Sequence, residues 1–227
     1  MITLGIETAT QVVSVAVGGE DGLLGLVEIL KGRRHAEVLT PAIEFVCRQA
    51  QVAVTEIGAI GVDIGPGLFT GMRVGIASAK VMAQTLQVPI VGVCSLDLLA
   101  FPLRHSSKVI TSVIDARKGE VFYALYLASP GGVQRLSEPC ASSIDDFNAH
   151  IIARGQDVLA VGDGADRYRE QLDPRIEVAD LTHPSAGPLV ALARAQVLRS
   201  DPGGLSGATI KPLYLRAPDA QINWTTR

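Results

Sequence analysis

Aromatic residues are scarce in this 227-residue chain, at 4% of the sequence. Proteins that hold single-stranded nucleic acid stack its bases on aromatic side chains, so such a role is disfavoured. A basic excess is also missing, because the formal net charge is -3 at pH 7 and the pI is near 5.8. Proteins that bind nucleic acid on their own normally carry a basic face. These shortages still allow a subunit that works beside a nucleic-acid-binding protein.

Long hydrophobic runs and export signals are missing as well. No apolar run reaches the roughly 18 residues that span a bilayer, and residues 1–7 lack the basic start and the cleavage site of a signal peptide. The three cysteines, Cys47, Cys94 and Cys140, form no CxxC pair and no even disulfide set. Free thiols in a reducing compartment are the natural interpretation. We therefore expect a cytoplasmic protein that makes no membrane contact.

Motifs for hydrolytic and metal chemistry are also lacking. The four histidines are scattered, and none has another histidine four residues away, as a helical zinc motif requires. No Gly-x-Ser-x-Gly elbow marks a nucleophilic serine. A peptidase or metalloenzyme is therefore disfavoured, and we predict no catalytic residue and no metal ligand.

The chain is rich in hydrophobic residues, at 48% against 19% charged, which is typical of a compact globular protein. Short apolar strands alternate with helical segments, and this alternation predicts an α/β fold. The expected strands are 2–7, 12–17, 23–30, 59–64, 89–93, 133–136 and 158–161. The expected helices are 35–51, 69–86, 95–99, 144–153, 165–172 and 185–200.

The opening of the chain recurs in its second half. Glu7 and Asp115 each end an apolar strand that turns and returns as a second hydrophobic strand. A break near residues 101–107 interrupts the apolar pattern between the two copies. Such internal similarity predicts two related lobes, residues 1–103 and 104–227, each a mixed sheet with flanking helices.

Small residues recur every four positions along the predicted helix 69–86. Gly71, Gly75, Ala79 and Ala83 therefore line up as one stripe. A glycine inside a helix costs about 1 kcal/mol relative to alanine, so Gly75 indicates that another backbone comes very close. The helix carries few charges and leaves almost no solvent face, which predicts that it is buried or faces a partner.

The Gly-rich turn before this helix, residues 65–69, has two interpretations. Its backbone N–H groups would cradle a phosphate at the helix N-terminus, or it is a packing corner with Thr70 as a local cap. Packing is favoured, because Gly65, Gly67 and Gly71 match neither nucleotide-binding spacing.

A carboxylate at the end of each lobe's first strand is the plan of the actin-like ATPase fold, where two such acids hold a metal–nucleotide between the lobes. The turns here suit that task poorly, since residues 8–11 contain no glycine. The basic turn at 117–118 would suit phosphate or is a solvated hairpin tip. The candidate vestigial nucleotide or phosphate contacts are Glu7, Asp115, Arg117, Lys118, Gly162 and Gly164.

Several of these segments together resemble the TsaB family, also called YeaZ, the dimerization subunits of the bacterial machinery that makes threonylcarbamoyladenosine in tRNA. The similarity covers nearly the whole chain. One departure is Glu7, where the family usually has aspartate. The segments that carry the resemblance are 4–10, 35–41, 65–75, 88–89, 95–96, 115–121 and 212–216.

The resemblance implies a two-lobed actin-like (ribonuclease H-like) fold and a non-catalytic role. It implies binding to the catalytic paralogue TsaD, with the ATPase TsaE as a further partner, only indirect contact with tRNA, and no cofactor held tightly by this chain alone. The alternative is an ATP-dependent transferase or kinase of the same fold that acts on its own.

In the family the partner-facing surface comes from the first two helices of the N-terminal lobe, which map onto 35–51 and 69–86. We expect a homodimer through the same helices when TsaD is absent, and we expect Gly75→Leu to block pairing without unfolding the chain. The predicted interface residues are Val38, Leu39, Ala42, Ile43, Val46, Gly71, Met72, Gly75, Ile76, Ala79 and Met82.

Overall fold

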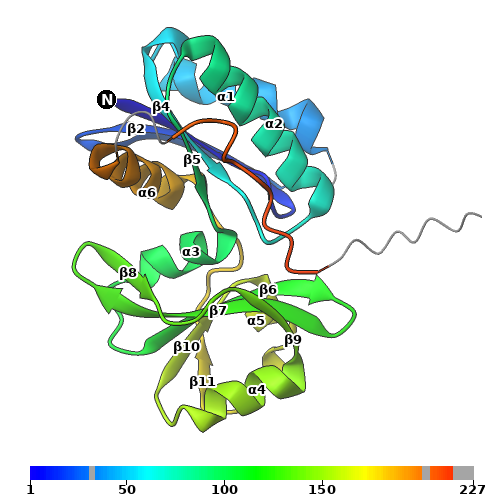
Figure 1. Cartoon of the computed structure of the whole chain (residues 1–227). Helices are drawn as coiled ribbons and strands as arrows, with labels where there is room; N and C mark the ends of the chain where they lie inside the picture. The colour runs from blue at the N-terminus through cyan, green and yellow to red at the C-terminus, as the bar shows by residue number, and fades with distance from the viewer. Residues whose placement is uncertain (31–33, 201–204, 217–227) are drawn as a thin grey trace, which may run out of the picture.

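The computed structural model describes residues 1–30, 34–200 and 205–216, and these form two lobes, one above the other in Figure 1. The first lobe is built on a five-stranded sheet with the order β3-β2-β1-β4-β5. β1 pairs antiparallel with β2, and β2 with β3, whereas β1, β4 and β5 are parallel. The strands are β1 (Ile2–Glu7), β2 (Val12–Gly19), β3 (Gly22–Leu30), β4 (Ile57–Asp63) and β5 (Ile90–Val93).

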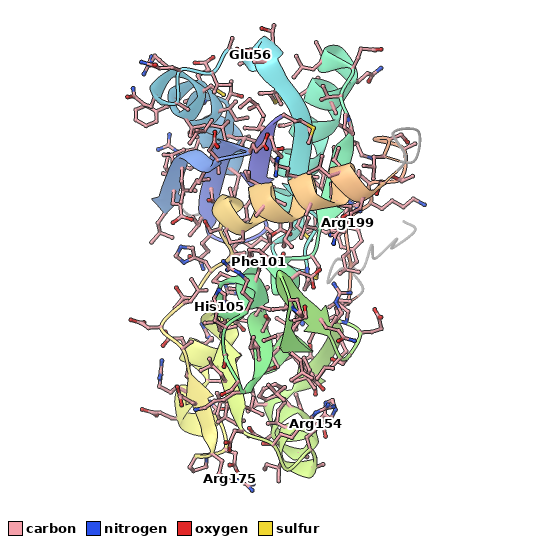
Figure 2. The ribbon with its side chains drawn as sticks, turned by 90° about the vertical axis from the view of Figure 1, so that its left-hand side faces the viewer. Glu56, Phe101, His105, Arg154, Arg175 and Arg199 are labelled. Atoms are coloured by element: carbon pink, nitrogen blue, oxygen red, sulfur yellow. The ribbon has the colours of Figure 1, made fainter. Side chains whose placement is uncertain are left out.

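Helices cover both faces of this sheet. α1 (His35–Gln49) and α2 (Phe69–Leu86) lie side by side on one face, and α6 (Ala186–Arg199) crosses the other. α1 buries apolar residues at helical spacing, such as Leu39, Ile43 and Val46, against the sheet. Figure 2 shows α6 lying across the first sheet, with Arg199 at its end.

The second lobe repeats this plan. Its six-stranded sheet has the order β11-β10-β6-β7-β8, with β9 paired to β7, so β8-β7-β6-β10-β11 corresponds to β3-β2-β1-β4-β5. The strands are β6 (Val109–Arg117), β7 (Glu120–Ser129), β8 (Gly132–Arg135), β9 (Cys140–Ser143), β10 (Val158–Val161) and β11 (Ile176–Val178). The helices are α3 (Ser95–Ala100), α4 (Ile144–Ala153) and α5 (Asp163–Arg167). The predicted internal repeat is therefore confirmed by topology.

The predicted division at residue 103 differs from the packing. α3 belongs to the core of the second lobe through Leu96 and Leu99, while α6 packs on β1, β2, β4 and β5 of the first. Ile210 also joins the first core, and the Leu213 N–H donates to the Ile64 carbonyl at 2.8 Å. The chain thus crosses between lobes twice, and Phe101 lies at the junction in Figure 2. The predicted second lobe beyond residue 216 lies outside the described residues.

Local details also differ from the predictions. α1 begins at His35 as predicted, with Pro41 in its interior, but it ends at Gln49 rather than at residue 51. α2 has Leu68 as its N-cap residue without a side-chain cap, so Thr70 is not the cap. β9 (Cys-Ala-Ser-Ser) and β11 (Ile-Glu-Val) escaped prediction because neither contains a continuous apolar run, whereas the equally short β10 (Val-Leu-Ala-Val) does. Among the described helices, none is both long and apolar enough to cross a bilayer.

Candidate functional site

Most residues predicted for the partner interface are covered by this chain's own first lobe. They lie on the sides of α1 and α2 that pack against the sheet and the β1–β2 turn, so the prediction was wrong for them. Val38 and Met82 are half-buried and pack against the same core. The buried ones are Leu39, Ala42, Ile43, Val46, Gly71, Met72, Gly75, Ile76 and Ala79.

Gly71 and Gly75 of α2 both lie against Thr8 in the chain's own β1–β2 turn. Gly71 meets the Thr8 backbone, whereas Gly75 meets the Thr8 side chain, so the backbone contact predicted at Gly75 was wrong. A Cβ on Gly71 would lie 2.1 Å from the Thr8 carbonyl oxygen, and one on Gly75 would lie 2.3 Å from the Thr8 hydroxyl. The Thr8 hydroxyl donates a hydrogen bond to the Gly71 carbonyl at 2.8 Å. These contacts explain why glycine occupies a helix interior.

The Gly-rich turn before α2 serves packing as well. A Cβ on Gly67 would lie 2.1 Å from the Ala9 carbonyl oxygen, and that oxygen accepts the Leu68 N–H at 2.6 Å. One backbone N–H group of the turn, that of Leu68, is therefore already bonded to the neighbouring β1–β2 turn. This supports the packing interpretation over a phosphate cradle.

The outward faces of α1 and α2 nevertheless carry exposed apolar side chains. Phe45 of α1 is 46% exposed, and Val81 of α2 is 63% exposed. Arg48 lies over the Phe45 ring at 5.9 Å. The two neighbouring helices thus each expose a large apolar side chain, the kind of residue that a protein-binding surface uses.

A cavity of about 420 Å³ lies between the lobes. It is lined by the β1–β2 turn, the end of β6, the start of α2 and the C-terminal segment 213–216, which includes Tyr214. Tyr214 stacks on Phe69 with ring centroids 5.2 Å apart. Arg73 lies 3.7 Å from the Phe69 ring centroid, and its Nε donates to the Tyr214 hydroxyl at 2.9 Å. The C-terminal segment thereby forms one wall of the cavity.

The two strand-end acids have different surroundings. Glu7 is fully buried, and burial, followed by repulsion from Asp63, raises its pKa well above the usual value. Asp115 lines the cavity, but its Oδ2 lies 3.0 Å from Arg117 and 3.5 Å from Arg167. Two guanidinium groups therefore already balance the Asp115 carboxylate.

Of the other residues predicted to contact a nucleotide, Gly162 and Gly164 pack against the backbone of β6, and Lys118 is exposed at the surface. A Cβ on Gly162 would lie 2.2 Å from the Val113 carbonyl oxygen, and one on Gly164 would lie 2.8 Å from the Ile114 carbonyl carbon. Neither glycine lines the cavity. Lys118 is exposed at the β6–β7 turn, where Arg117 and Lys118 have φ values of 67° and 58°.

The residues present do not fit a metal–nucleotide held between two acids. Glu7 is closed off from the cavity by its own turn, and Asp115 is engaged by arginines. Within the described residues no group of three or more potential metal-ligating side chains occurs.

Two contributors to this region escaped sequence reasoning. Asp63 ends β4 and lies beside Glu7, and its position after a buried strand was the available signal. Residues 213–216 were noted only for their resemblance to other sequences, since nothing local indicates that they reach the start of α2.

The family model for TsaD, tRNA N6-adenosine threonylcarbamoyltransferase, matches residues 23–224. An uncharacterized protein of Mycobacterium tuberculosis is 32% identical and covers 96% of this chain and 93% of its own. The tRNA threonylcarbamoyladenosine biosynthesis protein TsaB of Bacillus subtilis is 24% identical over 99% and 98% of the two chains. The TsaB of Escherichia coli is 33% identical over a region that covers 59% of this chain and 58% of its own.

Solved structures agree with these relatives. A Pseudomonas aeruginosa protein described as similar to peptidase YeaZ superposes with a TM-score of 0.84 at 28% identity, over 95% of this chain and 99% of its own. YeaZ from the same organism gives a TM-score of 0.78 at 26% identity, over 94% and 99%.

A more distant structure bears on the fold alone. The ethanolamine utilization protein EutJ of Carboxydothermus hydrogenoformans has a TM-score of 0.51 at 12% identity, over 85% and 90% of the chains. The expected two-lobed actin-like fold is confirmed. Relatives, family model and fold thus converge, and the chain belongs to the TsaB family, also called YeaZ, within the group that the TsaD model describes.

Proposed function

We propose that this chain is a non-catalytic subunit of the machinery that makes threonylcarbamoyladenosine in tRNA. In this proposal it binds and stabilises the catalytic paralogue TsaD in the cytoplasm, with TsaE as a further partner and tRNA contacted only through them. The observation that carries the proposal is the similarity to TsaB proteins, which are named for this biosynthesis. For the Bacillus subtilis TsaB, this similarity extends over 99% of this chain.

The partner surface that we propose is the outward side of α1 and α2, centred on Phe45 and Val81. Both side chains lose apolar exposure only if another protein covers them, since 46% and 63% of their surface is open. Burial of apolar surface stabilises an interface by roughly 25 cal/mol per Å² before the cost of association. The same surface would join two copies of this chain when TsaD is missing.

The engaged acids support the proposed absence of catalysis. Glu7 is sealed beneath the β1–β2 turn, and Asp115 is paired with Arg117 and Arg167. The alternative, an ATP-dependent transferase or kinase, is favoured by the cavity between the lobes, where actin-like proteins hold nucleotide.

Reconstitution tests the main proposal. Mixing this chain with TsaD, TsaE, tRNA and a threonylcarbamoyl donor is expected to give threonylcarbamoyladenosine in tRNA, whereas omitting this chain is expected to lower product formation at least tenfold. Nucleoside analysis of the tRNA measures the product. Unchanged product without this chain would contradict the proposed role.

Calorimetry with ATP and magnesium tests the alternative. We expect no tight binding and no ADP release by the chain alone, because Glu7 is closed off from the cavity and Asp115 is paired with Arg117 and Arg167. The same titration of the Asp115→Asn variant is the control, because heat that this variant also releases does not come from binding at Asp115. Tight ATP binding that disappears in Asp115→Asn would favour the kinase alternative.

A further inference from the structure

Two acidic side chains lie side by side inside the first lobe. β1 and β4 pair in parallel up to the residues just before Glu7 and Asp63, so these two acids continue the register at the carboxyl ends of the strands. Two residues earlier on each strand, Gly5 and Gly61 face α6, since an added Cβ would lie 2.9 and 2.7 Å from its atoms. Side chains alternate along a strand, so Glu7 and Asp63 point to that same covered face. Both are 0% exposed.

Each carboxyl uses only one of its oxygens. Glu7 Oε1 accepts two backbone N–H groups of the β1–β2 turn, at 2.7 and 3.3 Å. Asp63 Oδ1 accepts the Gly65 N–H and the Ser95 hydroxyl, both at 2.7 Å. Glu7 Oε2 and Asp63 Oδ2 have no hydrogen-bond partner among the residues that the structure describes. Buried acceptors without partners are rare, because their desolvation is not offset.

The charged and titratable neighbours add negative charge. Ser14, the β2 residue paired with Glu7, donates its hydroxyl to the Glu28 carboxylate of β3 at 3.1 Å. The negative charge of Glu28 raises the pKa of Glu7 further. Asp97 of α3 raises the pKa of Asp63, and the neighbouring Cys94 thiol is buried. The first backbone N–H of α6, that of Ala186, donates to the Ser14 hydroxyl and therefore not to either carboxyl. None of the ion pairs found in the described residues involves either carboxyl.

We propose that Glu7 Oε2 and Asp63 Oδ2 share one proton, and that this proton ties together the two turns that line the cavity between the lobes. One carboxyl is then neutral and donates its O–H to the other, so both unpartnered oxygens gain a hydrogen bond. Two acids that interact this strongly titrate as a pair.

The proton matters for the cavity because each acid anchors one of its walls. Glu7 holds the β1–β2 turn, and Asp63 holds the turn that begins at Gly65. The two turns meet where the Leu68 N–H donates to the Ala9 carbonyl at 2.6 Å. Loss of the proton places two like charges beneath this contact, which loosens both turns. This device does not depend on the proposed partner.

The direction of the pH effect follows from the pKa values. Burial is the main cause that raises the pKa of Asp63 to about 7, and the unfolded carboxyl titrates near about 4. The folded chain therefore keeps a proton that the unfolded chain releases. Its stabilising contribution is complete below about pH 4 and begins to be lost as the pH rises through about 7, the pKa of Asp63. Burial also raises the pKa of Glu7 well above its usual value, so the last proton of the pair leaves at the higher of the two pKa values.

Urea unfolding of the full chain between about pH 5.5 and 8.5 tests the proposal. For the wild type, the unfolding equilibrium constant is expected to rise by up to about tenfold per pH unit, the value for one linked proton. Glu7→Gln is expected to flatten this dependence, because its amide donates to Asp63 at every pH. The control Glu28→Gln removes a neighbouring acid without touching the pair, and it should keep the wild-type slope.

The infrared spectrum of the wild-type chain gives a second readout that needs no variant. A carbonyl band of a protonated carboxyl is expected near neutral pH and should vanish above about pH 8.5. A missing band, or an equal slope in wild type and Glu7→Gln, would overturn the proposal. Recovery of stability at high pH on adding magnesium or sodium would also overturn it, since the pair would then hold a cation.

Discussion

Gly71→Ala is expected to destabilise the folded chain by about 1–3 kcal/mol, the usual cost of forcing an extra carbon into a packed interior. The new Cβ would lie 2.1 Å from the Thr8 carbonyl oxygen. That oxygen belongs to the backbone of the β1–β2 turn, so it cannot rotate away as a side chain would. The helix-forming advantage of alanine, about 1 kcal/mol, offsets part of the cost. Urea unfolding monitored by circular dichroism measures the difference.

Gly187→Ala provides the matched control, because Gly187 also lies in a helix. Its added Cβ would come no closer than 3.7 Å to any neighbour, so this variant should be neutral or more stable. If Gly71→Ala unfolded at the wild-type urea concentration, the close approach of α2 to the β1–β2 turn would be refuted.

The same geometry revises the expectation for Gly75→Leu. A Cβ at Gly75 would lie 2.3 Å from the Thr8 hydroxyl, so a leucine would disrupt the first lobe rather than block a partner selectively. Loss of pairing in that variant would therefore report unfolding. A test of the interface needs an outward-facing side chain.

Val81→Glu is expected to weaken both TsaD binding and self-association at least tenfold while leaving the fold intact. Val81 is 63% exposed, and exposed substitutions usually change stability by less than about 0.5 kcal/mol. In a complex, however, the glutamate would be buried without a partner, which is costly. Co-purification with TsaD and sedimentation of the isolated chain measure the two associations.

Leu198→Glu is the control, because Leu198 is also 63% exposed but lies on α6, which covers the other face of the sheet. It should bind TsaD as the wild type does. Equal binding by Val81→Glu and the wild type would show that the partner uses another surface, whereas equal losses in both variants would indicate a nonspecific effect of the added charge.

Local pattern was sufficient for the secondary structure of the first lobe. The predicted helix 69–86 coincides with α2, and the predicted strand 2–7 coincides with β1. Their signals are strong because β1 is a short, mostly apolar run that is buried on both faces, and α2 repeats its buried residues at helical spacing. The short β9 and β11 lack this signal, and only pairing with longer strands defines them.

The candidate site depended more on tertiary structure. The spacing of Gly71 and Gly75 correctly predicted a very close neighbour, which is a backbone at Gly71 and a side chain at Gly75. A spacing carries no information about which segment supplies that neighbour. The turn at Thr8 lies 63 residues away from Gly71, and the same stripe would fit a partner helix equally well. For this reason the residues predicted for the interface included many that the chain itself covers.

By itself the sequence determined the alternation of strands and helices, the duplication of the lobes and the family resemblance, because each is carried by residues close in the chain or by whole motifs. Tertiary structure alone decided which helix face remains open, which lobe receives α3 and α6, and that Glu7 lies beside Asp63. These features arise when distant segments compete to bury the same apolar surface, and the outcome of that competition depends on shape complementarity in three dimensions.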